Sequence, residues 1–194
     1  MGNQTWEKDF VGQVSAGALL NTYTTAKSVI NPQSVLWLPA GFWFVGREIK
    51  VTFVAGVSNR VTGPDTFTVQ MMIGPAIPVT IIAFTSGAIN LTTTAHTTIP
   101  MVCEIWLKCT AVGSGTGATL VGQARFMGQM VAMAASLADG AANTGWAMGP
   151  NTAPANGTGF DSTIGNYLDC FVAQSFSGAG NGIQISDYRV NIEN

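Results

Sequence analysis

Residues 38–55 read LPAGFWFVGREIKVTFVA, and this segment decides the fold. Its second half alternates between apolar and polar side chains: Ile49, Val51, Phe53 and Ala55 against Glu48, Lys50 and Thr52. A period of two is typical of a strand with one face in a core and the other in solvent. We therefore expect a central strand of a β-sandwich at 47–55, with the aromatic residues at 42–44 closing one end of the core.

Outward from this segment, similar patterns predict further strands separated by turns rich in glycine and proline. They lie at 34–38, 66–73, 79–85, 102–111, 167–176 and 183–193, with a short return to the sheet at 160–163. The last strand changes phase, because Ile183 and Ile185 share one parity whereas Tyr188 and Val190 share the other. Such a slip predicts a β-bulge near 186–187. The expected fold is all-β: an antiparallel, jelly-roll-like β-sandwich of about eight strands, without a convincing helix.

Two regions are harder to assign. At 119–133 the Ala, Leu, Gln and Met residues would tolerate a helix. The alternation of Gln123 and Arg125 with Ala124 and Phe126 instead favours a strand paired back across the glycine-rich hairpin loop at 113–117. Residues 134–159 are almost all small or turn-forming, which predicts a long loop.

The domain organisation follows from these patterns. Residues 1–33 have weak periodicity and are expected to form an N-terminal arm and lead-in. Residues 34–194 are then expected to form a single jelly-roll domain that contains the long loop at 134–159.

The composition limits the classes of function. Only 9% of the 194 residues are charged, against about 25% in an ordinary soluble domain, and the formal net charge is −2. The eight Lys and Arg residues form no basic run, so no nucleic-acid partner is expected. The sequence shows neither an apolar run of membrane-spanning length nor signal-peptide regions, so we expect no membrane partner.

The cysteines are expected to be structural. Cys103 and Cys109 are six residues apart on one predicted strand, roughly 20 Å by strand rise, so they cannot bond to each other. Together with Cys170 they lack a recognisable zinc-ligand spacing. We expect three small core residues with free thiols, which would suit assembly in a reducing cytoplasm.

No motif predicts catalysis, a metal or a cofactor. His96 is the only histidine, and no Gly-x-Ser-x-Gly nucleophile elbow accompanies it. Asp161 and Asp169 are expected to be solvated or capping carboxylates, with a Ca²⁺ site formed across a loop as the alternative. We therefore expect a protein that is not an enzyme.

Seven motifs occur in a fixed order: LPAGFW at 38–43, VGREIKV at 45–51, TGPDTFT at 62–68, WLKCTAVG at 106–113, LVGQARF at 120–126, GFDST at 159–163 and GNGI at 180–183. In this order and spacing the chain resembles a family of bacteriophage virion proteins with a jelly-roll domain. The resemblance implies a structural role on the phage particle, as a capsid decoration or cement protein that is often trimeric. It supplies no catalytic residues.

Two classes of function therefore stay open. The first is a virion protein, assembled in the host cytoplasm, whose partners are copies of itself and the major capsid protein or other virion proteins. A cement protein stabilises a shell because it binds the assembled state better than the free subunits. The second is a carbohydrate- or receptor-binding module of a phage tail or fibre, suggested by a sandwich that carries five tryptophans.

The aromatic residues divide between core and interface in this interpretation. Trp37 and Trp43 are expected in the core. The candidate interface residues are Trp6, Phe10, Trp106, Trp146 and Met148.

Overall fold

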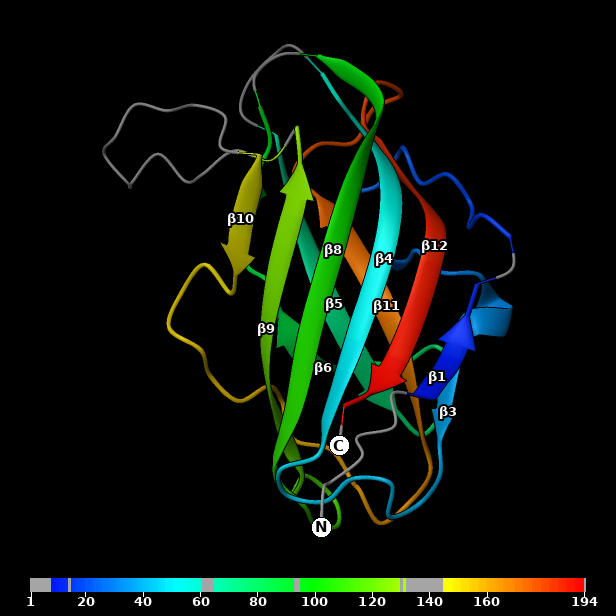
Figure 1. Ribbon diagram of the computed structural model, residues 1–194, viewed down its shortest axis with the longest axis vertical. Helices are drawn as coiled ribbons and strands as arrows, with labels where there is room; N and C mark the ends of the chain where they lie inside the picture. Colours follow the sequence, from blue (N-terminus) through cyan, green and yellow to red (C-terminus); the bar gives the residue numbers. More distant parts are fainter. Residues whose placement is uncertain are drawn as a thin grey trace, which may run out of the picture.

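The computed structural model describes residues 8–13, 15–60, 65–92, 95–129, 131 and 145–193. Within these residues, twelve strands and one short 3₁₀ helix (Pro32–Ser34) build two antiparallel sheets that pack face to face (Figure 1). The all-β sandwich predicted from the sequence is confirmed. No helix in the described part of the chain is long and apolar enough to cross a membrane.

Each sheet has six strands. Sheet A, in front in Figure 1, has the order β1 (Lys8–Gly12), β12 (Gly182–Ile192), β4 (Glu48–Asn59), β8 (His96–Ala111), β9 (Thr119–Gly128) and β10 (Trp146–Gly149). Sheet B has the order β2 (Lys27–Ser28), β11 (Asn166–Gln174), β5 (Thr66–Gly74) and β6 (Ile81–Thr85). Two short strands join sheet B: β3 (Leu36–Leu38) pairs with β11, and β7 (Ile89–Asn90) pairs with β5.

The strand pairing is nested. Strands early in the chain pair with strands late in the chain. The pairs are β1 with β12, then β2 and β3 with β11, then β4 with β8, and finally β5 with β6. The chain therefore runs as one long antiparallel hairpin. Further pairing of β12 with β4 and of β11 with β5 rolls this hairpin into two sheets. This is the jelly-roll arrangement. β9 and β10 extend sheet A beyond it.

β4 is the central strand that the sequence predicts. Its residues alternate between buried and partly exposed along the whole strand, and it lies between β12 and β8. The predicted bulge also forms, because the register of β12 against β4 shifts between Ile185 and Asp187. The segment at 119–128 is a strand, as its alternation indicated.

The structure differs from the sequence-based expectation at the sheet edges. β8 begins at His96 instead of 102, because the threonine-rich residues before 102 continue the ladder against the end of β4. β10 is a four-residue strand inside the segment predicted as a loop at 134–159, of which 134–144 lie outside the described residues. β1 and β2 place residues 8–12 and 27–28, expected in an arm, within the two sheets.

One apolar core fills the space between the sheets. Phe67 on β5 and Phe126 on β9 meet edge to face with ring centroids 5.3 Å apart, which joins the two sheets directly. Cys103, Cys109 and Cys170 belong to this core and are free thiols, as predicted.

One side of the sandwich is closed by the segment before β11. The Gly157 N–H donates to the Leu120 carbonyl on β9, and the Thr158 N–H donates to the Ile82 carbonyl on β6. This segment therefore satisfies backbone groups of both sheets and covers the edge of β6.

Candidate functional site

Three of the five predicted interface residues lie on one surface. Trp106 on β8 and Trp146 and Met148 on β10 occupy the solvent-facing positions of sheet A. Trp146 is 46% exposed and Met148 48%, whereas Trp106 is half-buried. Trp6 lies outside the described residues. Phe10 belongs to β1 at the opposite edge of the same sheet, where only its backbone is described.

The strand register places Arg125 midway between the two tryptophans. Trp106 pairs with Gln123 and Trp146 with Met127, and Arg125 lies between these two partners on β9. With about 3.4 Å per residue along a strand and about 4.8 Å between strands, the Cα atoms of the two tryptophans are roughly 17 Å apart. Trp106, Arg125 and Trp146 therefore form a diagonal row across three strands.

Glu104 binds two cations on this surface. Its Oε1 lies 2.8 Å from Lys50 Nζ, while Oε2 accepts hydrogen bonds from Nε of Arg125 at 3.0 Å and from Nη2 of the same side chain. The hydrogen bond from Lys50, with the one from Arg125, lowers the pKa of the Glu104 carboxyl although burial opposes this. Both oxygens are occupied and the group is ionised at neutral pH, so Glu104 is poorly suited to act as a general acid or base.

The same two cations flank the Trp106 indole. Lys50 Nζ lies 5.3 Å and Arg125 Cζ 5.9 Å from the ring centroid, within the range of a cation–π contact. These neighbours on β4 and β9 hold Trp106 in place before any ligand arrives, and a preorganised side chain loses little entropy on binding. We call this surface the Trp106 face and define it by its solvent-facing side chains: Lys50, Glu104, Trp106, Arg125, Trp146 and Met148.

Sequence reasoning found part of the Trp106 face. The alternation in β8 indicates that Glu104 and Trp106 point away from the core, and it does so correctly. The ion network joins three strands, β4, β8 and β9, and the register between them decides which charges meet. No signal in a single sequence gives that register across a long connection.

A second uncovered surface lies at the end of the sandwich where β4 begins, and we call it the loop end. Six large apolar side chains there are between 42% and 62% exposed: Trp37, Phe44, Val45, Ile77, Val112 and Ile164. Backbone hydrogen bonds fix three loops to one another, from Gly46 N–H to Cys109 O, from Gly41 N–H to Ser162 O and from Ser162 N–H to Gly113 O. Exposed apolar clusters of this kind mark interaction surfaces.

Arg47 organises the aromatic part of the loop end. Its Cζ lies 4.7 Å from the Phe42 centroid and 4.2 Å from the Phe44 centroid, and Nη1 donates to the Phe42 carbonyl at 2.6 Å. Phe42 and Trp43 are buried and meet edge to face, as the expected closure of the core requires. Phe44, which was expected to take part in this closure, is exposed instead.

The expectation that Trp37 lies in the core is wrong. Its side chain is 48% exposed and packs on Tyr167, with ring centroids 4.7 Å apart. The reason is parity, because Leu36 and Leu38 take the buried side of β3 and leave Trp37 outside.

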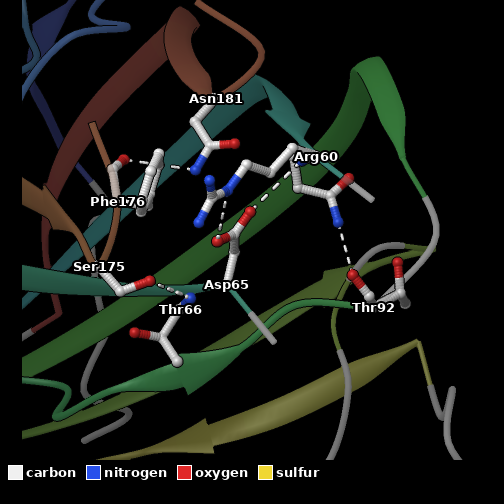
Figure 2. A network of polar contacts seen from close by, with 8 residues as sticks. Arg60, Asp65, Thr66, Thr92, Ser175, Phe176 and Asn181 are labelled. Atoms are coloured by element: carbon white, nitrogen blue, oxygen red, sulfur yellow. Dashed lines mark hydrogen bonds and ion pairs between the residues drawn. The ribbon is translucent and has the colours of Figure 1, made fainter. Parts of the chain in front are cut away.

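The opposite end of the sandwich holds a polar network that the sequence did not single out (Figure 2). Asp65, only 3% exposed, accepts from the Arg60 backbone N–H at 3.3 Å and faces the Arg60 Nε at 3.5 Å. The guanidinium stacks on Phe176, and the Asn59 amide donates to the Thr92 carbonyl. These contacts tie the ends of several strands together, which indicates a structural role.

Of the other predicted candidates, Asp161 lies on a loop of the loop end, whereas Asp169 and His96 lie away from both surfaces. Asp161 accepts hydrogen bonds from the backbone N–H groups of Gly115 and Thr163, and from the Thr163 hydroxyl, so it caps a loop. Asp169 is buried and accepts from a serine hydroxyl on β2 instead. His96 lies at the start of β8. Among the described residues, no group of three or more His, Cys, Asp or Glu side chains could hold a metal ion.

Comparison with known proteins leaves the family open. No protein family matches the chain, and no curated protein sequence matches it. Solved structures that match include the CBM2 module of Lactobacillus casei BL23 phage J-1 evolved Dit, at 8% identity and a TM-score of 0.36, covering 98% of both chains. Others are lectin I from Ulex europaeus, at 9% identity and a TM-score of 0.34 over 98% of both chains, and the sugar-binding EclA C-terminal domain, at 8% identity and 0.28 over 98% of this chain and 80% of that one.

These likenesses to β-sandwich sugar-binding and lectin domains are distant. All three TM-scores are below 0.5. The resemblance to phage virion proteins also stays a prediction.

Proposed function

We propose that this chain is a non-catalytic carbohydrate-binding module, of the kind carried by a phage tail or fibre, and that it binds saccharide on the Trp106 face. The observation that carries the proposal is the diagonal row of Trp106, Arg125 and Trp146. Tryptophan combines a large apolar ring with an N–H donor, which suits a ligand that has both C–H faces and hydroxyl groups.

The length of the row supports an extended ligand. Its roughly 17 Å span, set by four residues along β9 and two strand spacings, is longer than one sugar ring. Polar side chains accompany it, since Gln123 is exposed beside Trp106 and Arg125 is nearly half exposed. An extended oligosaccharide would contact both rings and the guanidinium between them.

A glycan screen read out by tryptophan fluorescence and calorimetry tests this proposal. We expect Trp106→Ala and Trp146→Ala each to weaken binding about tenfold or more, which corresponds to about 1.4 kcal/mol. Trp37→Ala is the matched control, because it removes an exposed tryptophan from the loop end instead. A panel without a single binder, or binding that survives both substitutions, would refute the proposal.

A second candidate function is a capsid decoration or cement protein, and the loop end favours it. Six exposed apolar side chains lie at the loop end, where backbone hydrogen bonds join three loops, and a partner could cover this surface. In this role the chain would act in the virion, as a homotrimer bound to the major capsid protein.

Two measurements test this second candidate. Light scattering would give a multiple of the 20.2 kDa monomer if the chain assembles alone. Purified particles should contain the protein, and the double substitution Val45→Lys and Ile164→Lys should remove it from them without changing its thermal stability. Absence of the unmodified protein from particles would exclude the role.

A further inference from the structure

Cations are concentrated on the solvent side of four neighbouring strands of sheet A. The solvent side of β4, β8, β9 and β12 carries four cations and three carboxylates: Lys50, Lys108, Arg125 and Arg189 against Glu48, Glu104 and Asp187. This gives 4 − 3 = +1, whereas the complete chain has eight Lys and Arg against ten Asp and Glu and a net charge of −2. Half of all the cations therefore lie on this one side of one sheet.

The charges around Trp106 are also arranged by depth. The Glu104 side chain is only 13% exposed, whereas Lys50 is 25% exposed and Arg125 45%. The carboxylate is the least exposed of the three groups, each of its oxygens has a cationic partner, and the two cations lie beside the ring. A ligand that approaches from solvent meets the two positive groups first.

Arg125 keeps donors for such a ligand. A guanidinium has five N–H groups, and the Glu104 carboxylate takes one from Nε and one from Nη2. Its remaining donors have the planar fork geometry that matches carboxylate, sulfate and phosphate oxygens. The group is held from below by Glu104, so it is already oriented toward solvent midway between Trp106 and Trp146.

We propose that the ligand of the Trp106 face is an anionic polysaccharide, with an acidic group on Arg125 and neighbouring sugar rings on Trp106 and Trp146. This inference rests on the proposed carbohydrate-binding function and narrows its ligand class. The ligands in this class are sugar polymers that carry a carboxylate, sulfate or phosphodiester group. Charge complementarity selects it, because the Lys50 and Arg125 cations are both more exposed than the Glu104 carboxylate that pairs with them.

The test is calorimetry of the full chain with four polymers: polygalacturonate for carboxylate, dextran sulfate for sulfate, a teichoic acid for phosphodiester, and neutral dextran. Each is measured at about 20 mM and about 300 mM NaCl, which changes the screening length severalfold. We expect one of the three anionic polymers to bind, with an affinity that falls tenfold or more at high salt, and dextran to bind at least tenfold more weakly.

Four variants, one of them a control, test whether that binding occurs on the Trp106 face. Arg125→Gln should weaken it tenfold or more, and Trp146→Ala should weaken it as well. Arg189→Gln is the matched control, because Arg189 is on the same side of sheet A but pairs with Asp187 on β12, and affinity should stay within threefold. Glu104→Gln should tighten binding severalfold, since it removes the negative charge beneath the cations, and a purely structural role would not produce a gain.

The failures of the two proposals are distinguishable. Binding of neutral glycans that depends on Trp106 and ignores salt would overturn this inference and leave the carbohydrate-binding function standing. No binding to any anionic or neutral glycan would overturn both. Equal binding of duplex DNA and of the polysaccharides would also overturn the inference, because a polyanion would then be bound without recognition of its sugars.

Discussion

The Ser28 hydroxyl on β2 donates a 2.9 Å hydrogen bond to the buried Asp169 carboxylate on β11. Asp169 is 3% exposed, and burial raises the pKa of its carboxyl to about 6, although the bond from Ser28 acts in the other direction. This pair therefore gives the fold a dependence on pH.

The first prediction is that stability falls as pH rises from about 4 to about 6. In that window the folded state holds a proton on Asp169 that the unfolded state, with a pKa near 3.9, has released, so deprotonation favours unfolding. A pKa of about 6 in the folded state, against about 3.9 in the unfolded state, lowers the free energy of unfolding by roughly 3 kcal/mol across this window. Urea unfolding of the natural chain and of Asp169→Asn should diverge across this window, with the variant more stable at pH 7. Parallel pH profiles would contradict the assignment.

The second prediction concerns the thiols. Cys103, Cys109 and Cys170 are buried in the core, and burial raises the pKa of each thiol. Because only the thiolate reacts, none of the three should be labelled by a thiol reagent in the folded protein. All three should react after denaturation in guanidinium. Rapid labelling of the native chain would show that a thiol is accessible.

The third prediction tests how closely the sheets approach at Gly122 on β9. A Cβ atom there would lie 2.3 Å from the Phe84 ring of sheet B and 3.0 Å from Leu107. Gly122→Ala should therefore destabilise the fold by about 1–3 kcal/mol through overpacking. Gly12→Ala on β1 is the control, because no atom lies within 4 Å of its Cβ position, and its melting temperature should hardly change. Equal effects of the two substitutions would argue against the packing described.

The fourth prediction compares two ion pairs that differ in burial. Asp65→Asn should cost about 1–3 kcal/mol, because it removes the charge that faces Arg60 at a site where the carboxylate is 3% exposed. Asp187→Asn removes the partner of Arg189 at the surface and should cost under about 0.5 kcal/mol. Thermal unfolding of both variants provides the measurement, and a larger loss for Asp187→Asn would reverse the ranking.

The sequence was informative wherever one face of a strand is buried. Alternation located β4, β5 and β11, and the phase change in β12 located the bulge beside Asp187, because a period of two ties each side chain to one face. The same parity would have placed Trp37 outside, since Leu36 and Leu38 on either side of it are buried.

The features that the sequence did not predict depend on pairing between strands. β10 was missed because its four residues lie in a stretch of small residues and owe their strand structure to β9. The meeting of Lys50, Glu104 and Arg125 likewise depends on the registers β4–β8 and β8–β9. Only the β8–β9 register has a short hairpin to set it, so the sequence could suggest the outward direction of Trp106 but not its charged neighbours.

The position of β12 has a consequence for how the chain acquires its structure. This strand, the last in the described sequence, lies inside sheet A between the edge strand β1 and β4. Until residues 182–192 have left the ribosome, β1 has no partner in the sheet and one side of β4 stays open. Folding of such a topology depends on contacts between distant parts of the chain and is intrinsically slow. Newly synthesised chains should therefore expose an unpaired strand edge until synthesis of β12 is complete, and association during that interval is a kinetic hazard of this fold.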